Sequence, residues 1–133
     1  MSLENVNLLG AVVGAAAAMG IGALWYSPFL FGNRWQSLIG KRPDEMGSPV
    51  MSMVLATLMF LLFGIGLSWV VPDGADLGIC LMWSFLAFWA FVLPATVING
   101  VFEGRGWPLM AIYLGYMLLA TLVIGAIVCL LGG

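Results

Sequence analysis

The stretch LLGAVVGAAAAMGIGALWYSPFLFGNRW, residues 8–35, decides the fold of this protein. Its first part, residues 8–25, is apolar and carries no charged side chain. At about 1.5 Å per residue, an α-helix of that length nearly crosses a hydrocarbon core of about 30 Å. The stretch therefore predicts a membrane-spanning helix that ends in an abrupt change of chemistry at Trp25.

Small residues repeat along this first helix. Gly10, Gly14, Ala18 and Gly22 follow one another at four-residue intervals, which places them on one helix face. Helices in a bilayer gain no hydrophobic attraction for one another, and small residues let their backbones approach closely. The stripe predicts tight packing against a second helix, which belongs either to the same chain or to a neighbouring molecule.

Three further apolar segments follow, over residues 50–71, 77–98 and 108–131, and none contains a charged residue. Hydrophobic residues make up 63% of the chain and charged ones 8%, against about 45–50% and about 25% in soluble domains. The segments lack the alternating polarity of barrel strands. We expect residues 1–133 to form one all-α domain, a bundle of four transmembrane helices.

The residues after the first span predict an elbow at the membrane surface. Trp25 and Tyr26 are amphipathic aromatic residues of the kind that gathers at headgroup depth. Ser27 and Pro28 have the chemistry of an N-cap and a first helical residue. We therefore expect a short helix over residues 28–40, lying in the plane of the interface.

Two interpretations of this elbow stay open. In the first it is structural, with Trp35 on the apolar face of the short helix and Arg34 reaching toward lipid phosphates. In the second, Trp25, Tyr26 and Trp35 form the mouth of a ligand pocket.

A polar patch follows the proline of the third segment. Pro94 is expected to kink the helix, and Thr96 and Asn99 either satisfy the freed backbone groups or line a cavity. Glu103 and Arg105 are charged residues expected at the interface, as a surface ion pair or beside a bound lipid headgroup. A site for a lipid headgroup or a small amphipathic ligand would use Trp25, Tyr26, Trp35, Thr96, Asn99, Tyr113 and Tyr116.

The basic residues predict the orientation of the chain. All four, Arg34, Lys41, Arg42 and Arg105, lie in the connections after the first and third segments. Cytoplasmic loops carry the excess of Lys and Arg in membrane proteins. We expect both termini to face away from the cytoplasm, in a bacterial inner membrane.

The inventory of reactive residues is small. The chain has no histidine, and its expected spans contain no ionisable acid or base. Cys80 and Cys129 lie far apart and form no CxxC pair, so each is expected to be a separate buried thiol. We therefore expect no metal site, no cofactor and no enzymatic activity. The net charge of −2 does not favour binding of nucleic acid.

Three stretches carry a resemblance: WYSPFLFGNRW from Trp25, LPATVINGVFEGRGW from residue 93, and YLGYMLLATLVIGAI from Tyr113. They resemble the family catalogued as domain of unknown function 1761 (DUF1761), small four-helix membrane proteins whose most specific motif is WYSPxLFGxxW. The resemblance implies the fold and no established function. In the family pattern a histidine follows the tyrosine of the fourth helix, and Met117 stands there in this chain. An activity that depends on that histidine would be missing.

For function, we first expect a non-enzymatic membrane protein that forms a homo-oligomer, or joins a partner membrane protein, through the small-residue stripe. The alternative is a carrier, channel or binding protein for a membrane lipid or a small neutral or hydrophobic molecule. An enzyme is the third hypothesis, and the sequence nominates no residue to carry it.

Overall fold

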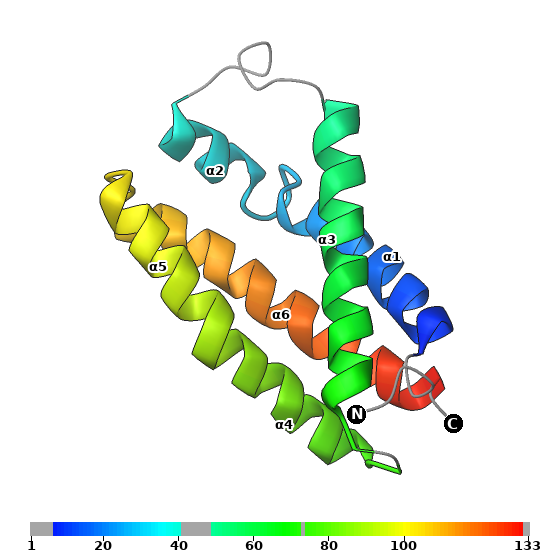
Figure 1. The fold of residues 1–133 in the computed structure, drawn as a ribbon. Helices are drawn as coiled ribbons and strands as arrows, with labels where there is room; N and C mark the ends of the chain where they lie inside the picture. Colours follow the sequence, from blue (N-terminus) through cyan, green and yellow to red (C-terminus); the bar gives the residue numbers. More distant parts are fainter. Residues whose placement is uncertain (1–6, 41–48, 73, 132–133) are drawn as a thin grey trace.

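The computed structural model describes residues 7–40, 49–72 and 74–131, and in this part of the chain helices are joined by turns, with no strand (Figure 1). The predicted all-α class is confirmed. The elements are α1 (Leu8–Trp25), α2 (Gly32–Ile39), α3 (Pro49–Val70), α4 (Leu77–Ala87), the π-helical η3 (Phe88–Val92), α5 (Leu93–Phe102) and α6 (Trp107–Leu131).

Four of the described helices are long and apolar enough to cross a membrane: Leu8–Trp25, Val50–Val70, Leu77–Phe102 and Trp107–Leu131. The third, made of α4, η3 and α5, ends four residues later than the sequence predicts. Large apolar side chains point outward, including Leu62 (61% exposed) and Phe91 (75% exposed). Apolar surface on this scale is unusual for a monomer in water and suits contact with lipid.

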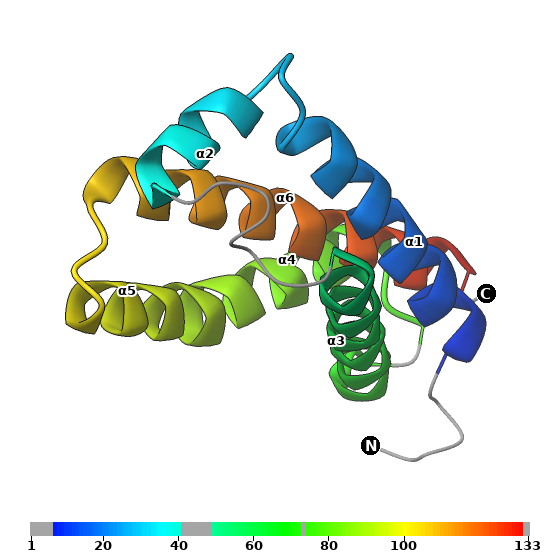
Figure 2. The ribbon, with the colours of Figure 1, turned by 90° about the horizontal axis from the view of Figure 1, so that it is seen from above.

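The helices are arranged around a close pair formed by α1 and α6. Helix α3 packs mainly on α1, and α4 packs on α6. As Figures 1 and 2 show, α3 and the continuous α4–α5 helix meet near the turn that joins them and diverge toward their other ends. The buried core lies where α1, α3 and α6 meet, and includes Ala15, Ala18, Phe60, Tyr116, Ala120 and Ile124.

The small-residue stripe of α1 packs against α6 of the same chain. A Cβ added at Gly14 would lie 3.3 Å from the Cγ2 atom of Ile124, and one at Gly10 would lie 3.0 Å from the Cα of Val128. Ala18, the next residue of the stripe, is fully buried. Of the two alternatives that the sequence leaves open, the structure therefore shows packing within the chain.

A tyrosine of α6 forms a hydrogen bond to α1 farther along the same contact. The hydroxyl of Tyr116 donates a hydrogen bond to the backbone carbonyl of Ala18 over 2.6 Å. A Cβ at Gly22 would lie 2.7 Å from that hydroxyl oxygen, closer than real contacts allow. The glycine therefore makes room for the tyrosine, and the two helices are joined by a directional bond as well as by close packing.

Asn7 ties the first turn of α1 to its neighbours. Its side-chain oxygen accepts from the backbone N–H of Gly10 at 2.9 Å, which caps the helix. Its side-chain nitrogen donates to the carbonyl of Val128 in α6 at 3.0 Å, and its backbone N–H donates to the hydroxyl of Ser68 in α3 at 3.0 Å. One residue thus links the ends of three helices.

The helix of the elbow after α1 is shorter than the predicted helix over residues 28–40: it begins at Gly32 rather than Pro28 and ends at Ile39. Ser27 is not an N-cap, because its hydroxyl donates back to the carbonyl of Leu24 at 2.6 Å. Its carbonyl instead accepts from the N–H of Gly32 at 2.9 Å, which closes a turn. A Cβ at Gly32 would collide with the backbone of Tyr26 and Ser27, so this turn requires glycine.

The helix around Pro94 contains a π-helical turn. Over Phe88–Val92 the helix is wider, and the N–H of Leu93 donates to the carbonyl of Phe88, five residues back. Pro94 follows directly. A proline ring clashes with the carbonyl four residues before it in a regular α-helix, and a π-turn is one of the ways a helix adapts locally.

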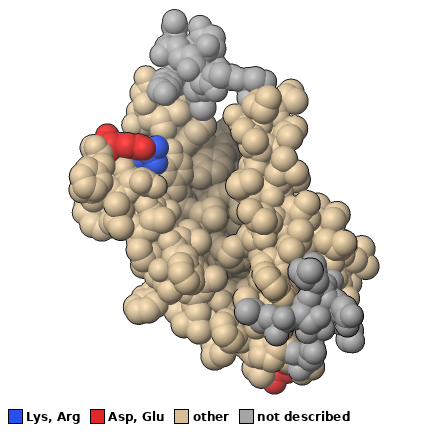
Figure 3. Space-filling view, in the orientation of Figure 1, with Lys and Arg blue, Asp and Glu red and all other residues tan. Residues whose placement is uncertain are grey.

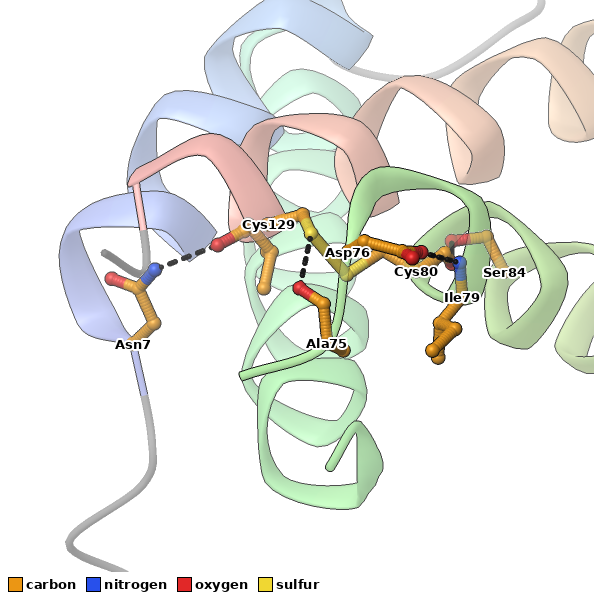
Figure 4. The surroundings of a disulfide bond; sticks show 8 residues. Asn7, Ala75, Asp76, Ile79, Cys80, Ser84 and Cys129 are labelled. Carbon is orange, nitrogen blue, oxygen red and sulfur yellow. Dashed lines mark hydrogen bonds between the residues drawn. A yellow bond between two sulfur atoms is a disulfide. The ribbon is translucent and has the colours of Figure 1, made fainter. Parts of the chain in front are cut away.

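The two cysteines form a disulfide bond between α4 and α6, so the prediction of separate thiols is wrong (Figure 4). Their Cα atoms lie 6.1 Å apart although 49 residues separate them in sequence. Cys80 sits in the first turn of α4, whose N-terminus Asp76 caps by accepting from the N–H of Ile79 at 2.9 Å. Cys129 is near the end of α6, and the two helix ends meet only in the folded chain.

We expect Gly14→Leu to lower the stability of the folded protein, because the larger side chain must displace Ile124. Overpacking of this kind costs about 1–3 kcal/mol. Unfolding in a detergent titration measures the change. The matched control is Gly20→Leu on the same helix, where an added Cβ meets nothing within 4 Å. Equal stabilities of the two variants would contradict the packing of the stripe on α6.

We also expect both thiols to resist alkylation in denatured protein until a reductant is added. Cys129→Ser should lower the free energy of unfolding by at most about 4 kcal/mol, the chain-entropy value for a loop of 49 residues. Cys80→Ser should match it, and the double variant should add nothing further. Alkylation of both thiols without reduction, read as a mass increase, would disprove the bond.

Candidate functional site

Two adjoining cavities, of about 660 Å³ and about 460 Å³, lie on the inner side of α3. They share five lining residues and are treated below as one space, the tyrosine cleft; the shared residues are Tyr26, Ala56, Phe60, Tyr113 and Tyr116. The larger part extends to Thr96 and Arg105, and the smaller to Trp35. Figure 3 shows the hollow between α3 and the α5 side of the molecule.

The cleft exists because α3 leans on α1 and separates from α5. Close packing of α3 against α1 uses small residues on both helices: a Cβ at Gly64 would lie 3.0 Å from the Cα of Ala11. At the other end of α3 the facing side chain is the small Ala56, and α5 has already diverged. The cleft occupies the space between them.

Aromatic rings in edge contacts form the inner wall of the cleft. The ring of Tyr26 lies 5.3 Å from that of Trp35 and 5.5 Å from that of Tyr116, and Phe60 lies 5.9 Å from Tyr116. Edge-to-face pairs at such distances are favourable beyond the apolar area that they bury. The wall is therefore a set of rings that hold one another in place, contributed by the C-cap of α1 and by α2, α3 and α6.

The polar groups of the cleft come mainly from three tyrosines, one tryptophan and one arginine. The hydroxyl of Tyr113 accepts from the indole N–H of Trp35 at 3.3 Å. The guanidinium of Arg105 lies over the ring of Tyr113, 5.4 Å from its centroid, in a cation–π contact. Burial raises the pKa of the Tyr26 hydroxyl, which stays neutral and available as a donor.

Among the described residues that line the cleft, Arg105 is charged and the others are uncharged. It also pairs with Glu103, and the two side chains are 36% and 54% exposed. Glu103 is not among the lining residues. The charge that faces the cleft is therefore positive. Arg34, on α2, is exposed.

The structure brings together most of the binding residues that the sequence predicts. Those lining the cleft are Tyr26, Trp35, Thr96, Tyr113 and Tyr116. Trp25 instead packs behind the wall, where its indole N–H donates to the carbonyl of Ile112 at 3.1 Å and its ring lies 4.6 Å from that of Phe31. Asn99 is exposed on α5 and does not line the cleft.

Sequence reasoning missed the contribution of α3. Ala56, Met59, Phe60 and Phe63 line the cleft, but α3 is apolar around its whole circumference, so no pattern separates its cleft face from its outer face. Lys41 and Arg42, on which the orientation argument also depends, lie outside the described residues.

The arrangement can hold a mainly apolar molecule and orient it by a few polar groups at one end, as ligand pockets generally do. Among the described residues, no group of three or more His, Cys, Asp or Glu side chains could hold a metal ion. The lining residues supply hydrogen-bond donors and one cation rather than a nucleophile paired with a base.

Fold and site together define an all-helical protein of four long apolar helices around a lateral cleft. The chain belongs to the family described as protein of unknown function (DUF1761), whose model matches residues 9–129, most of its length. Neither the curated proteins nor the solved structures contain a match. Met117, which follows Tyr116 in α6, lines the cleft.

Proposed function

We propose that this protein is a membrane-embedded binding protein or carrier for a hydrophobic or amphiphilic small molecule, held in the tyrosine cleft. The observation that carries the proposal is the cleft itself. Its two parts measure about 660 Å³ and about 460 Å³, within the range of about 300–1,000 Å³ typical of ligand sites. Apolar rings line it, and polar groups converge near Tyr113 and Arg105.

The geometry favours this function over self-association through the stripe. The glycines of α1 are in contact with α6 of the same chain, so they do not supply a surface for a second molecule. A non-enzymatic role is part of the proposal, because the lining residues offer binding groups without a paired nucleophile and base.

We further propose that both termini face away from the cytoplasm of a bacterial inner membrane, with α2 lying at the cytoplasmic interface. Arg34 and Arg105 belong to elements near the same end of the bundle, and Asp76 with the disulfide lies at the opposite end. Basic residues favour the cytoplasmic side, and disulfides persist on the oxidising side. The two arguments are independent and give the same orientation.

Ala56→Trp tests the binding function, because the new ring would occupy the shared part of the cleft. We expect the fraction of protein that retains a small molecule in native mass spectrometry to fall about tenfold or more. The control is Leu55→Trp, on the neighbouring residue of α3, which is 51% exposed. Wild-type protein without any retained molecule, or equal retention in both variants, would refute the function.

A cysteine added after Gly133 tests the orientation. We expect a membrane-impermeant maleimide to label it in intact cells, since the C-terminus should face outward. Serine at positions 80 and 129 removes competing thiols, and a cysteine replacing Gly40, the C-cap of α2, is the opposite-side control. Labelling of the C-terminal thiol only after lysis would reverse the orientation.

A further inference from the structure

We propose that the ligand of the tyrosine cleft is an anionic phospholipid, with its phosphate held by Arg105 and an acyl chain lying along α3 on the aromatic wall. This inference rests on the proposed binding function and specifies the chemistry of its ligand. Three properties of the cleft carry it: its extent along the bundle, its opening between α3 and α5, and the sign of its charge.

The extent of the cleft matches a molecule with a long apolar part. Its lining residues on α3 run from Ser52 to Phe63, which at about 1.5 Å per residue is roughly 16 Å along the axis. A hydrocarbon core is about 30 Å thick, so the cleft starts near one end of α3 and passes its midpoint. A lipid of the adjacent leaflet already has its headgroup at the depth of that end of α3 and its acyl chain at the depth of the midpoint.

The opening of the cleft faces sideways. The bounding helices α3 and α5 diverge toward the end that carries Arg105 (Figures 1 and 2). Met59, in the lining, is 58% exposed, and Figure 3 shows the hollow reaching the molecular surface. An acyl chain could therefore enter the cleft from the bilayer without passing through water. A soluble metabolite would first have to leave the water.

The charge of the cleft selects an anion. Arg105 has five N–H donors in a planar fork, which suits bidentate binding of phosphate. Its contact with the Tyr113 ring holds the fork at the rim, and its ion pair with Glu103 uses only part of its donor capacity. A phosphate can accept from the remaining donors while the ion pair persists.

The same geometry disfavours a cationic ligand. Aromatic rings can bind quaternary ammonium groups, and the cleft is rich in them. However, the guanidinium already lies over the ring of Tyr113, and among the described residues no acidic side chain lines either cavity to offset a second positive charge. A cation placed among these rings would be repelled by Arg105.

The test uses the full-length protein in detergent, with phosphatidylglycerol and phosphatidylcholine of identical chains added in turn. Native mass spectrometry counts the bound lipid on each variant. We expect wild-type protein to retain phosphatidylglycerol in preference to phosphatidylcholine. In Arg105→Gln, retention of phosphatidylglycerol should fall about tenfold or more, because a charge-assisted contact is lost. Arg105→Lys should keep an intermediate level.

Arg34→Gln is the matched control. It removes an arginine of α2, which lies at the same end of the bundle as Arg105, and Arg34 does not line the cleft. It should leave retention unchanged. Thermal unfolding of each variant without lipid shows whether a loss of binding is a loss of folding, and Arg105→Lys preserves the test if the glutamine variant unfolds. Inorganic phosphate at millimolar concentration should not displace the lipid, whereas displacement would identify a free phosphate as the ligand.

Two outcomes separate this inference from the function on which it rests. Equal retention of both lipids by wild-type protein, or of phosphatidylglycerol by wild type and Arg105→Gln, would overturn the phospholipid assignment and leave a binding cleft in place. Failure to retain either lipid or any co-purified molecule, with Ala56→Trp behaving as wild type, would overturn both.

Discussion

The close contact between α1 and α6 is the constraint on which the rest of the structure depends. Glycines at positions 10, 14 and 22 bring the two backbones together, and the hydroxyl of Tyr116 adds a hydrogen bond to the carbonyl of Ala18 at 2.6 Å. In lipid, packing and internal hydrogen bonds replace the hydrophobic effect as the forces between helices. Close packing and hydrogen bonds of this kind therefore define which faces of α1 and α6 remain for the other helices.

The cleft follows from this arrangement. Once α6 occupies the small-residue face of α1, α3 packs on a neighbouring face of α1, where Gly64 meets Ala11. The α4–α5 helix is fixed to α6 at one end by the disulfide from Cys80 to Cys129. The end of α3 and the start of α4 are thus held near Asn7 and Cys129, and α3 and α5 separate toward the opposite end. The site is the space that this divergence leaves. Tyr116 both joins α1 to α6 by its hydrogen bond and forms part of the wall of the cleft.

Much of the architecture could be predicted because each span is a local property of its own segment. Hydropathy and the absence of charge placed α1 at Leu8–Trp25, as the structure has it. The start of α2 was missed because Ser27 has the chemistry of a cap but uses its hydroxyl within the turn, which only Gly32 allows to close. The disulfide was missed because its cysteines are 49 residues apart, and nothing local records that two helix ends meet.

The sequence by itself determined that this chain forms apolar helices, where they begin and end within a few residues, and which polar and aromatic residues gather near the end that carries Arg105. These are consequences of composition and helical periodicity. Tertiary structure alone decided that the stripe of α1 meets α6 rather than another molecule, that Trp25 and Asn99 lie outside the cleft, and that α3 supplies one side of it. The reason is that a helix that is apolar all round does not encode which face meets protein and which meets lipid.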